Sequence, residues 1–171
     1  DQNKLIELLE EFTQFKLAQS ETYLSIEKRI ADASEREQRL DEVSQYARQK
    51  IAERILDEST PAVAVDFLQT QFHKFVNEVL LREGPGGASW RPIMNTIDVL
   101  LWTVQSERNE GDIERFIKVN PRLLLNLGKA LTVAGYDEAE REVALNQLKQ
   151  VQEDSFKGLV QQRKEAEEES E

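Results

Sequence analysis

Two stretches decide the fold, TPAVAVDFLQTQFHKFVNEVLLRE (residues 60–83) and SWRPIMNTIDVLLWTV (residues 89–104), which a glycine-rich loop joins. In the first stretch Thr60 precedes Pro61, a pairing typical of an N-cap and a first helical residue. Its apolar residues share one face at helical spacing, and they are Val65, Leu68, Phe72, Phe75, Val76 and Val79. The other side carries Asp66, Thr70, His73 and Asn77. We expect one amphipathic helix over residues 60–83.

The second stretch predicts a helix at the centre of its domain, because most of its residues are apolar. Ser89 is a suitable N-cap, and Pro92 is tolerated in a first turn. The broad apolar face comprises Trp90, Ile93, Met94, Ile97, Leu100, Leu101 and Val104. Trp102 falls on the polar side, so either a second element packs against it or it binds a partner. Aromatic residues at helical spacing usually belong to a core, which favours the first interpretation.

The composition excludes several classes of protein. The net charge of −11 argues against binding to nucleic acid and to anionic membrane surfaces. The absence of cysteine excludes disulfides and thiolate metal sites, and it is compatible with the cytoplasm. No apolar run is long enough to span a bilayer, and no signal peptide opens the chain. Because the chain begins in mid-helix, we expect it to be a piece of a longer protein.

Residues 1–58 contain no glycine or proline and predict a long helix, straight or bent near residues 32–34. A first apolar stripe comprises Leu5, Leu8, Phe12 and Phe15. A second comprises Leu40, Val43, Ala47, Ile51 and Ile55. The three- and four-residue spacing of the first stripe is typical of a coiled-coil-like seam. If the helix is long, this end extends beyond the bundle and leaves its seam uncovered.

The remaining sequence predicts further helices. Asp112 begins a short helix, and Asn120-Pro121 begins another, which Gly135 ends. Asp137 and Glu140 have the spacing of a capping box for a last helix reaching about residue 162. The charged tail 163–171 is expected to be disordered.

The expected fold is all-α: a bundle of about five helices over residues 59–162, preceded by the long N-terminal helix. One core is expected to hold Leu68, Phe72, Ile97, Leu101, Leu124 and Leu127.

Four blocks of sequence resemble a known family. They are Pro61 with Val65-Asp66-Phe67-Leu68, Leu81-Arg82-Glu83-Gly84 with Trp90, Asp98-Val99-Leu100-Leu101-Trp102, and Pro121-Arg122-Leu123-Leu124 with Ala134-Gly135-Tyr136. In this order they resemble the C-terminal region of the bacterial domain-of-unknown-function family sixteen thirty-one. Members are often labelled thymidine phosphorylases, and some relatives are linked to cyclic-dinucleotide-binding domains. The resemblance implies a bacterial, cytoplasmic protein, and it supplies no catalytic residue.

No residue pattern indicates a catalytic, metal or cofactor site. His73 is the only histidine and is expected at the surface or its boundary, without enough ligands around it for a metal. Asp98 is expected to cap a helix or pair with Arg82 or Arg122. The loop 84–87 precedes a helix but lacks the lysine of a phosphate-binding loop, so it is interpreted as a connector.

The sequence therefore favours a non-enzymatic helical interaction or regulatory module of a larger bacterial protein. The alternatives are part of an enzyme such as a nucleoside phosphorylase, or a region of a cyclic-dinucleotide signalling protein. The candidate interaction residues are Leu5, Leu8, Phe12, Phe15 and Trp102. An exposed apolar seam is unstable in water, so a protein partner or a second copy is expected to cover it. We expect a dimer through residues 5–30.

Overall fold

The computed structural model describes residues 5, 7, 8 and 26–170. Its helices are α2 (Ile26–Arg54), α3 (Ala62–Gln69), α4 (Gln71–Glu83), α5 (Trp90–Val104), α6 (Asp112–Val133) and α7 (Glu138–Glu169). The described part contains no strand. Five helices, α3 to α7, thus follow one long helix, and the predicted all-α fold is confirmed. None of the described helices has the length and apolarity needed to cross a membrane.

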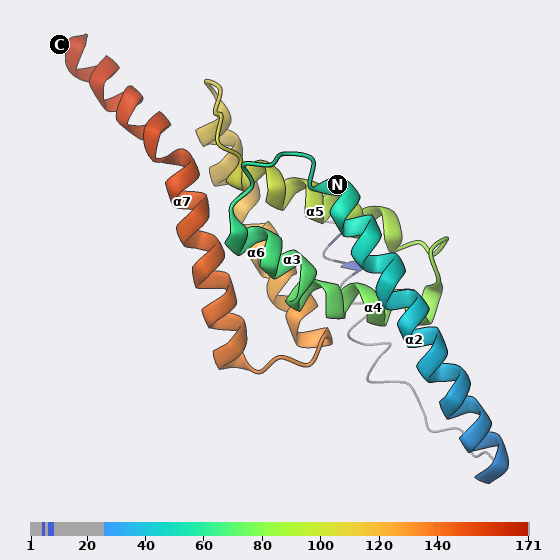
Figure 1. The fold of residues 1–171 in the computed structure, drawn as a ribbon. Coiled ribbons are helices and arrows are strands. Elements are labelled where there is room, and N and C mark those ends of the chain that lie inside the picture. The colour runs from blue at the N-terminus through green and yellow to red at the C-terminus, as the bar shows by residue number, and fades with distance from the viewer. Residues whose placement is uncertain (1–4, 6, 9–25, 171) are drawn as a thin grey trace.

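The two long helices, α2 and α7, flank the shorter helices (Figure 1). On one side α2 packs on α3, α4 and α5, and on the other α7 packs on α3, α5 and α6. The N-terminal end of α2 and the C-terminal end of α7 point away from the body in opposite directions (Figure 1). Most of the bundle is therefore assembled between two helical arms.

The core draws on every described helix from α2 to α7, with α5 near its centre. Of the six predicted core residues, Leu68, Phe72, Ile97 and Leu127 are buried, while Leu101 and Leu124 are half-buried against the same cluster. The start of α5 is packed against α2, where the rings of Trp90 and Tyr46 lie 5.7 Å apart.

Residues 60–83 form two helices, so the prediction of one continuous helix is wrong. The helix breaks at Thr70, whose backbone has φ −120° and ψ −78°. In a single helix Phe67 and Phe72 would point about 140° apart, because successive residues turn by about 100°. The break lets both rings enter the core, with their centroids 6.2 Å apart. The first helix begins after Pro61, not at Thr60, whose Oγ1 donates to the Asp57 carbonyl instead.

Residues 112–133 show the opposite error, since one helix was predicted to end before Pro121 and another to begin there. α6 runs through Pro121 without a break. Proline in a helix interior removes one backbone hydrogen bond. Burial of Leu123, Leu127 and Leu131 on the core side offsets that loss, because an unbroken α6 packs on α4, α5 and α7 together.

The ends of α6 and α7 agree in part with the sequence. Gly135 has φ +97° and Tyr136 N–H donates to the Leu131 carbonyl at 3.0 Å, which is the predicted glycine C-cap. Asp137 accepts from the backbone N–H of Glu140 at 2.8 Å, as the capping box predicts. However, α7 does not end near residue 162 but continues to Glu169.

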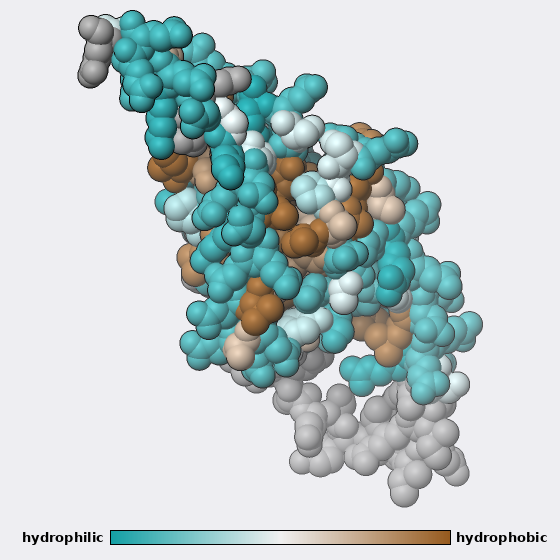
Figure 2. Space-filling view, turned by 60° about the vertical axis from the view of Figure 1, so that its left-hand side comes forward, coloured by the Kyte–Doolittle hydropathy of each residue, from teal (hydrophilic) through white to brown (hydrophobic). Residues whose placement is uncertain are grey.

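The last turns of α7 lie outside the bundle. The side chains of residues 164–170 are exposed, and Figure 2 shows a hydrophilic surface over this end, whereas apolar side chains gather over the middle of the molecule. The segment contains no glycine or proline and consists mostly of strong helix formers, so it stays helical without core contacts.

Within its described part the N-terminal helix is continuous, as predicted, but it ends at Arg54 and not at residue 58. α2 has 29 residues and passes through residues 32–34 as a regular helix. The second apolar stripe faces the bundle, with Ala47 and Ile51 fully buried, Val43 and Ile55 half-buried, and Leu40 at the exposed end of the stripe.

Candidate functional site

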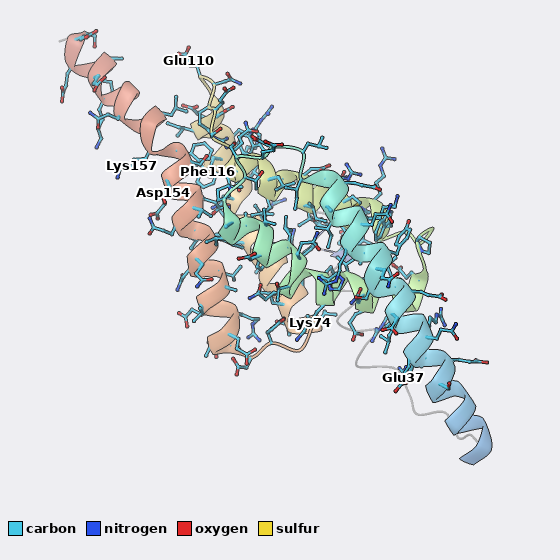
Figure 3. All side chains as sticks on the ribbon, in the orientation of Figure 1. Glu37, Lys74, Glu110, Phe116, Asp154 and Lys157 are labelled. Atoms are coloured by element: carbon cyan, nitrogen blue, oxygen red, sulfur yellow. The ribbon has the colours of Figure 1, made fainter. Side chains whose placement is uncertain are left out.

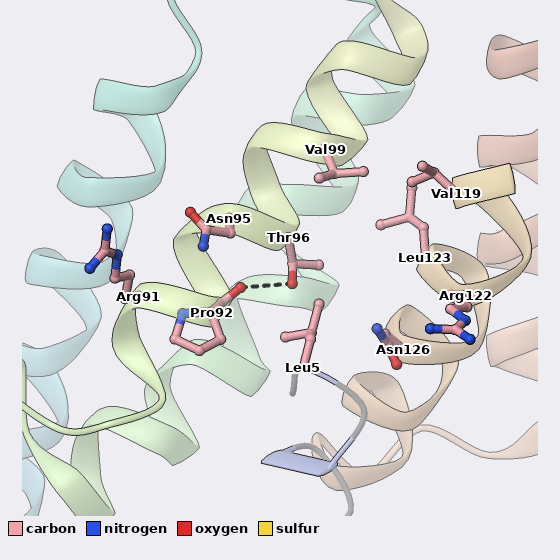
Figure 4. A pocket seen from close by; sticks show the side chains of 10 residues that line it. All are labelled: Leu5, Arg91, Pro92, Asn95, Thr96, Val99, Val119, Arg122, Leu123 and Asn126. Carbon is pink, nitrogen blue, oxygen red and sulfur yellow. Dashed lines mark hydrogen bonds between the residues drawn. The ribbon is translucent and has the colours of Figure 1, made fainter. Parts of the chain in front are cut away.

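A pocket of about 430 Å³ lies between α5 and α6 (Figure 4). One wall is formed by residues of α5: Arg91, Pro92, Asn95, Thr96 and Val99. The other is formed by residues of α6: Val119, Arg122, Leu123 and Asn126. Both sets recur at three- or four-residue spacing, which places each on one helical face. We call this site the α5–α6 groove.

The groove is apolar at its centre and polar at its rim. Val99, Val119 and Leu123 face one another across it (Figure 4). The Thr96 hydroxyl donates to the Pro92 carbonyl at 2.9 Å, so its hydrogen-bonding capacity is partly met within α5.

Asn126 is the most buried polar residue of the groove. It is only 1% exposed, and its Oδ1 has no hydrogen-bond partner among the described residues. Buried polar atoms are nearly always hydrogen-bonded. This amide therefore marks a place where an occupant of the groove could supply a donor.

The rim carries positive charge. Arg91, Asn95 and Arg122 are exposed, and the described residues that line the groove include no acidic one. The groove is thus suited to an apolar side chain with acidic neighbours.

Leu5 lines the same groove, between the two helices (Figure 4). It is half-buried and packs against the core cluster. The expectation that this end of the chain extends beyond the bundle is therefore wrong at Leu5. Leu8 is half-buried and Glu7 is exposed, as expected for an amphipathic segment. Phe12 and Phe15 lie outside the described residues.

Trp102 lies where α5 meets α7, so a second element does pack against it. Its ring lies 6.0 Å from that of Phe156 in an edge-on arrangement. The ring of Phe116 of α6, which Figure 3 labels beside α7, lies 4.2 Å from that of Phe156. The Arg108 guanidinium lies 5.1 Å from the Trp102 ring and donates to the Trp102 carbonyl. Burial lowers the pKa of Arg108, and Asp112 at 3.7 Å opposes that shift. Trp102 therefore belongs to an intramolecular aromatic cluster.

Gln152 is a core residue that the sequence pattern alone did not single out. It is fully buried on α7, at the position between Leu148 and Phe156 in the inward-facing stripe. Its Nε2 donates to Thr103 Oγ1 of α5 at 3.0 Å and to Asn120 Oδ1 of α6 at 2.9 Å. A glutamine at an apolar position of a stripe was the signal available in the sequence. We call these three residues the polar clasp.

His73 is buried, so the prediction of a surface or boundary position is wrong. The break at Thr70 and the packing of α4 on α2 bring it to the Ser44 carbonyl, 3.0 Å from Nε2. A carbonyl oxygen only accepts, so Nε2 carries the proton and donates. Burial lowers the pKa of His73, which favours the neutral ring.

Asp98 pairs with neither of the predicted arginines. Its Oδ2 accepts from Arg54 Nη1 of α2 at 3.0 Å, and both side chains are more than 40% exposed. This is a surface contact, and such pairs contribute little to stability.

The loop 84–87 connects α4 to α5. Gly84 has φ +73° and ends α4. Ser89 does not cap α5 through its side chain, because its hydroxyl donates back to Glu83 at 3.2 Å. Among the described residues, no group of three or more His, Cys, Asp or Glu could hold a metal ion.

Comparison with known proteins gives one family. The model of the third domain of the DUF1631 protein of unknown function matches residues 33–149, which is more than half of the chain. No curated protein and no solved structure matches.

Proposed function

The chain belongs to the DUF1631 family, and from that premise we propose that this domain is a non-enzymatic protein-interaction module of a cytoplasmic protein. In this proposal the α5–α6 groove binds one face of an amphipathic helix. The observation that carries the proposal is the position of Leu5, which lines the groove and packs against the core cluster. An apolar groove that takes a leucine from a helix is a recurring way in which proteins bind helical segments.

The chemistry of the groove supports an acidic occupant. Arg91 and Arg122 place two positive charges at its rim. The sequence around Leu5 is LIELLEEF, residues 5–12, with carboxylates between its apolar residues. Opposite charges on groove and occupant favour the correct partner and speed its association.

The same segment offers a route to self-association. A groove that Leu5 of its own chain lines can take the same leucine from a second copy, which is the exchange found in domain-swapped dimers. The proposal therefore includes a dimer formed at high concentration through the N-terminal residues 5–30. Cis and exchanged forms use the same contacts, so their balance depends on concentration.

Binding of a peptide tests the groove. In the Leu5→Ser variant the chain no longer offers its own leucine to the groove. A fluorescent peptide of residues 1–16 is titrated with this variant, and binding is followed by fluorescence anisotropy. We expect saturable binding that weakens at least tenfold when Val99→Asp is added, because a carboxylate in an apolar site is costly. Val143→Asp is the matched control, since Val143 is 59% exposed on α7 and lies outside the groove.

Two outcomes would overturn the proposal. One is equal binding by the peptide of residues 1–16 and by its Leu5→Ser version. The other is thymidine phosphorolysis by the intact chain that is lost with Arg122→Ala, which would identify an enzyme instead. Light scattering of the chain against its Phe12→Glu, Phe15→Glu variant tests self-association, and a monomer in both cases would remove the dimer from the proposal.

A further inference from the structure

The outer face of α6 carries an exposed apolar ridge. Ile117, Pro121 and Leu125 are spaced four residues apart and lie on one side of the helix. Ile117 is 66% exposed and Leu125 is 52% exposed, and Pro121 is exposed as well. Large aliphatic residues exposed together along a helix indicate an interaction surface more often than isolated ones do. We call these three residues the α6 ridge.

The ridge faces away from the bundle because the other side of α6 is fully engaged. Leu123, Leu127 and Leu131 on that side are buried in the core cluster, and α6 packs on α4, α5 and α7. Neither Ile117 nor Leu125 belongs to the core cluster. The ridge is therefore not part of the packing that holds the described helices together.

The ridge is bordered by positive charge along most of its length, with Glu114 at its N-terminal end. Residues 115–129 include Arg115, Lys118, Arg122 and Lys129 and contain no acidic residue, although the chain as a whole has a net charge of −11. At 100° per residue Lys118, Arg122 and Lys129 fall beside the ridge, on the side toward the α5–α6 groove. A basic strip beside an apolar ridge fits a helix that carries carboxylates beside apolar residues.

We propose that the α6 ridge and its basic strip bind an acidic amphipathic helix of another protein. Antiparallel pairing with a second copy of α6 would bring the two basic strips together, so the charges favour an acidic helix over a second α6 in that arrangement. An anionic membrane or a nucleic acid fits less well than a helix, since the net charge of the rest of the chain repels an extended anionic surface. Apart from Arg122, which borders both surfaces, the ridge and its basic strip share no residue with the α5–α6 groove.

A pair of designed peptides tests the ridge. The probe is an 18-residue helical peptide with leucines along one face and glutamates flanking them, and its counterpart has lysines in place of the glutamates. We expect the glutamate peptide to bind the intact chain and the lysine peptide to bind at least tenfold more weakly. Ile117→Ser, Leu125→Ser should weaken the glutamate peptide at least tenfold, and Lys118→Glu should weaken it while strengthening the lysine peptide.

Three controls establish that the peptide binds at the ridge and at no second surface. Val143→Ser removes another exposed aliphatic side chain, on α7, and should leave binding unchanged. Val99→Asp blocks the groove and should also leave binding of the glutamate peptide unchanged. Failure of the groove proposal can therefore be distinguished from failure of the ridge proposal. Circular dichroism of each variant establishes that the helices remain.

The inference is overturned if Ile117→Ser, Leu125→Ser binds the glutamate peptide as the unaltered chain does. It is also overturned if vesicles with anionic lipids, or a DNA duplex, bind the ridge in preference to the peptide. A dimer that Ile117→Ser, Leu125→Ser dissociates would show that the occupant is a second copy instead.

Discussion

Replacing Gln152 tests whether the polar clasp stabilises the bundle. The side chain is fully buried, and its amide donates to Thr103 and Asn120 on two other helices. Each hydrogen bond contributes about 1 kcal/mol net, so losing both costs about 2 kcal/mol. Truncation to alanine also leaves a cavity in a site closed to solvent, which adds about 1–2 kcal/mol. Removal of the Gln152 Oε1, which has no hydrogen-bond partner among the described residues, offsets about 1 kcal/mol. We therefore expect Gln152→Ala to lower the free energy of unfolding by about 2–3 kcal/mol.

Gln152→Leu is the matched variant, because leucine fills nearly the same space without hydrogen bonds. The Gln152 Oε1 has no hydrogen-bond partner among the described residues. Leucine removes that unsatisfied oxygen, which offsets part of the loss, so we expect a cost of about 1 kcal/mol. The difference between the two variants then measures the cavity.

Urea unfolding followed by far-ultraviolet circular dichroism measures all three free energies. A Gln152→Leu chain at least as stable as the original would refute the stabilising role of the clasp. A cost below about 1 kcal/mol for Gln152→Ala would refute the placement of Gln152 in the core, because truncations in a core cost more.

Three further predictions concern pH, a glycine cap and a surface ion pair. Burial lowers the pKa of His73, so the unfolded chain binds a proton there more readily than the folded chain does. The contribution of His73 to stability is therefore complete above the ordinary pKa of about 6.5 and is lost as the pH falls below it. Urea unfolding over a pH series checks this, and the same dependence of the unfolding free energy on pH in His73→Gln would contradict it. Gly135→Ala should lower the free energy of unfolding by about 1–2 kcal/mol, because φ is +97° there. Gly158→Ala inside α7 should raise it by about 0.5–1 kcal/mol. Equal thermal midpoints for the two variants would disprove the role of Gly135 as the glycine that ends α6. Arg54→Ala should change stability by less than about 0.5 kcal/mol, since its pair with Asp98 is exposed, and a loss above about 2 kcal/mol in urea would show that the pair is structural.

Helix type and core membership were predictable because they depend on local spacing. The apolar residues of α5 recur at helical intervals, and Ile97 and Leu100 are buried as that pattern predicts. The boundaries were less predictable, because tertiary packing overrode local signals. At Thr70 the sequence offers no strong breaker, yet the helix breaks so that two aromatic rings enter the core. At Pro121 it offers a strong breaker, yet α6 continues.

The groove could not be predicted from the sequence, since its walls come from segments far apart in the chain. The spacing of Leu5 and Leu8 identified an apolar face but not the surface that would cover it. The partner of Asp98 and the burial of His73 depend on α2 lying beside α4 and α5, which no local pattern encodes. The resemblance to family sixteen thirty-one, in contrast, rests on short blocks of consecutive residues, and it is confirmed.

The two tryptophans of α5 make this helix a natural pair of optical reporters. Trp90 is its first residue and touches Tyr46 of α2, while Trp102 near its other end touches Phe156 of α7. The two indoles are separated by about 18 Å along the helix axis. Tryptophan fluorescence of the two single Trp→Phe variants would thus report separately, during refolding, when α2 packs on Trp90 and when α7 packs on Trp102. Because the chain contains no cysteine, one introduced thiol would give a unique attachment point for an energy-transfer acceptor on either arm.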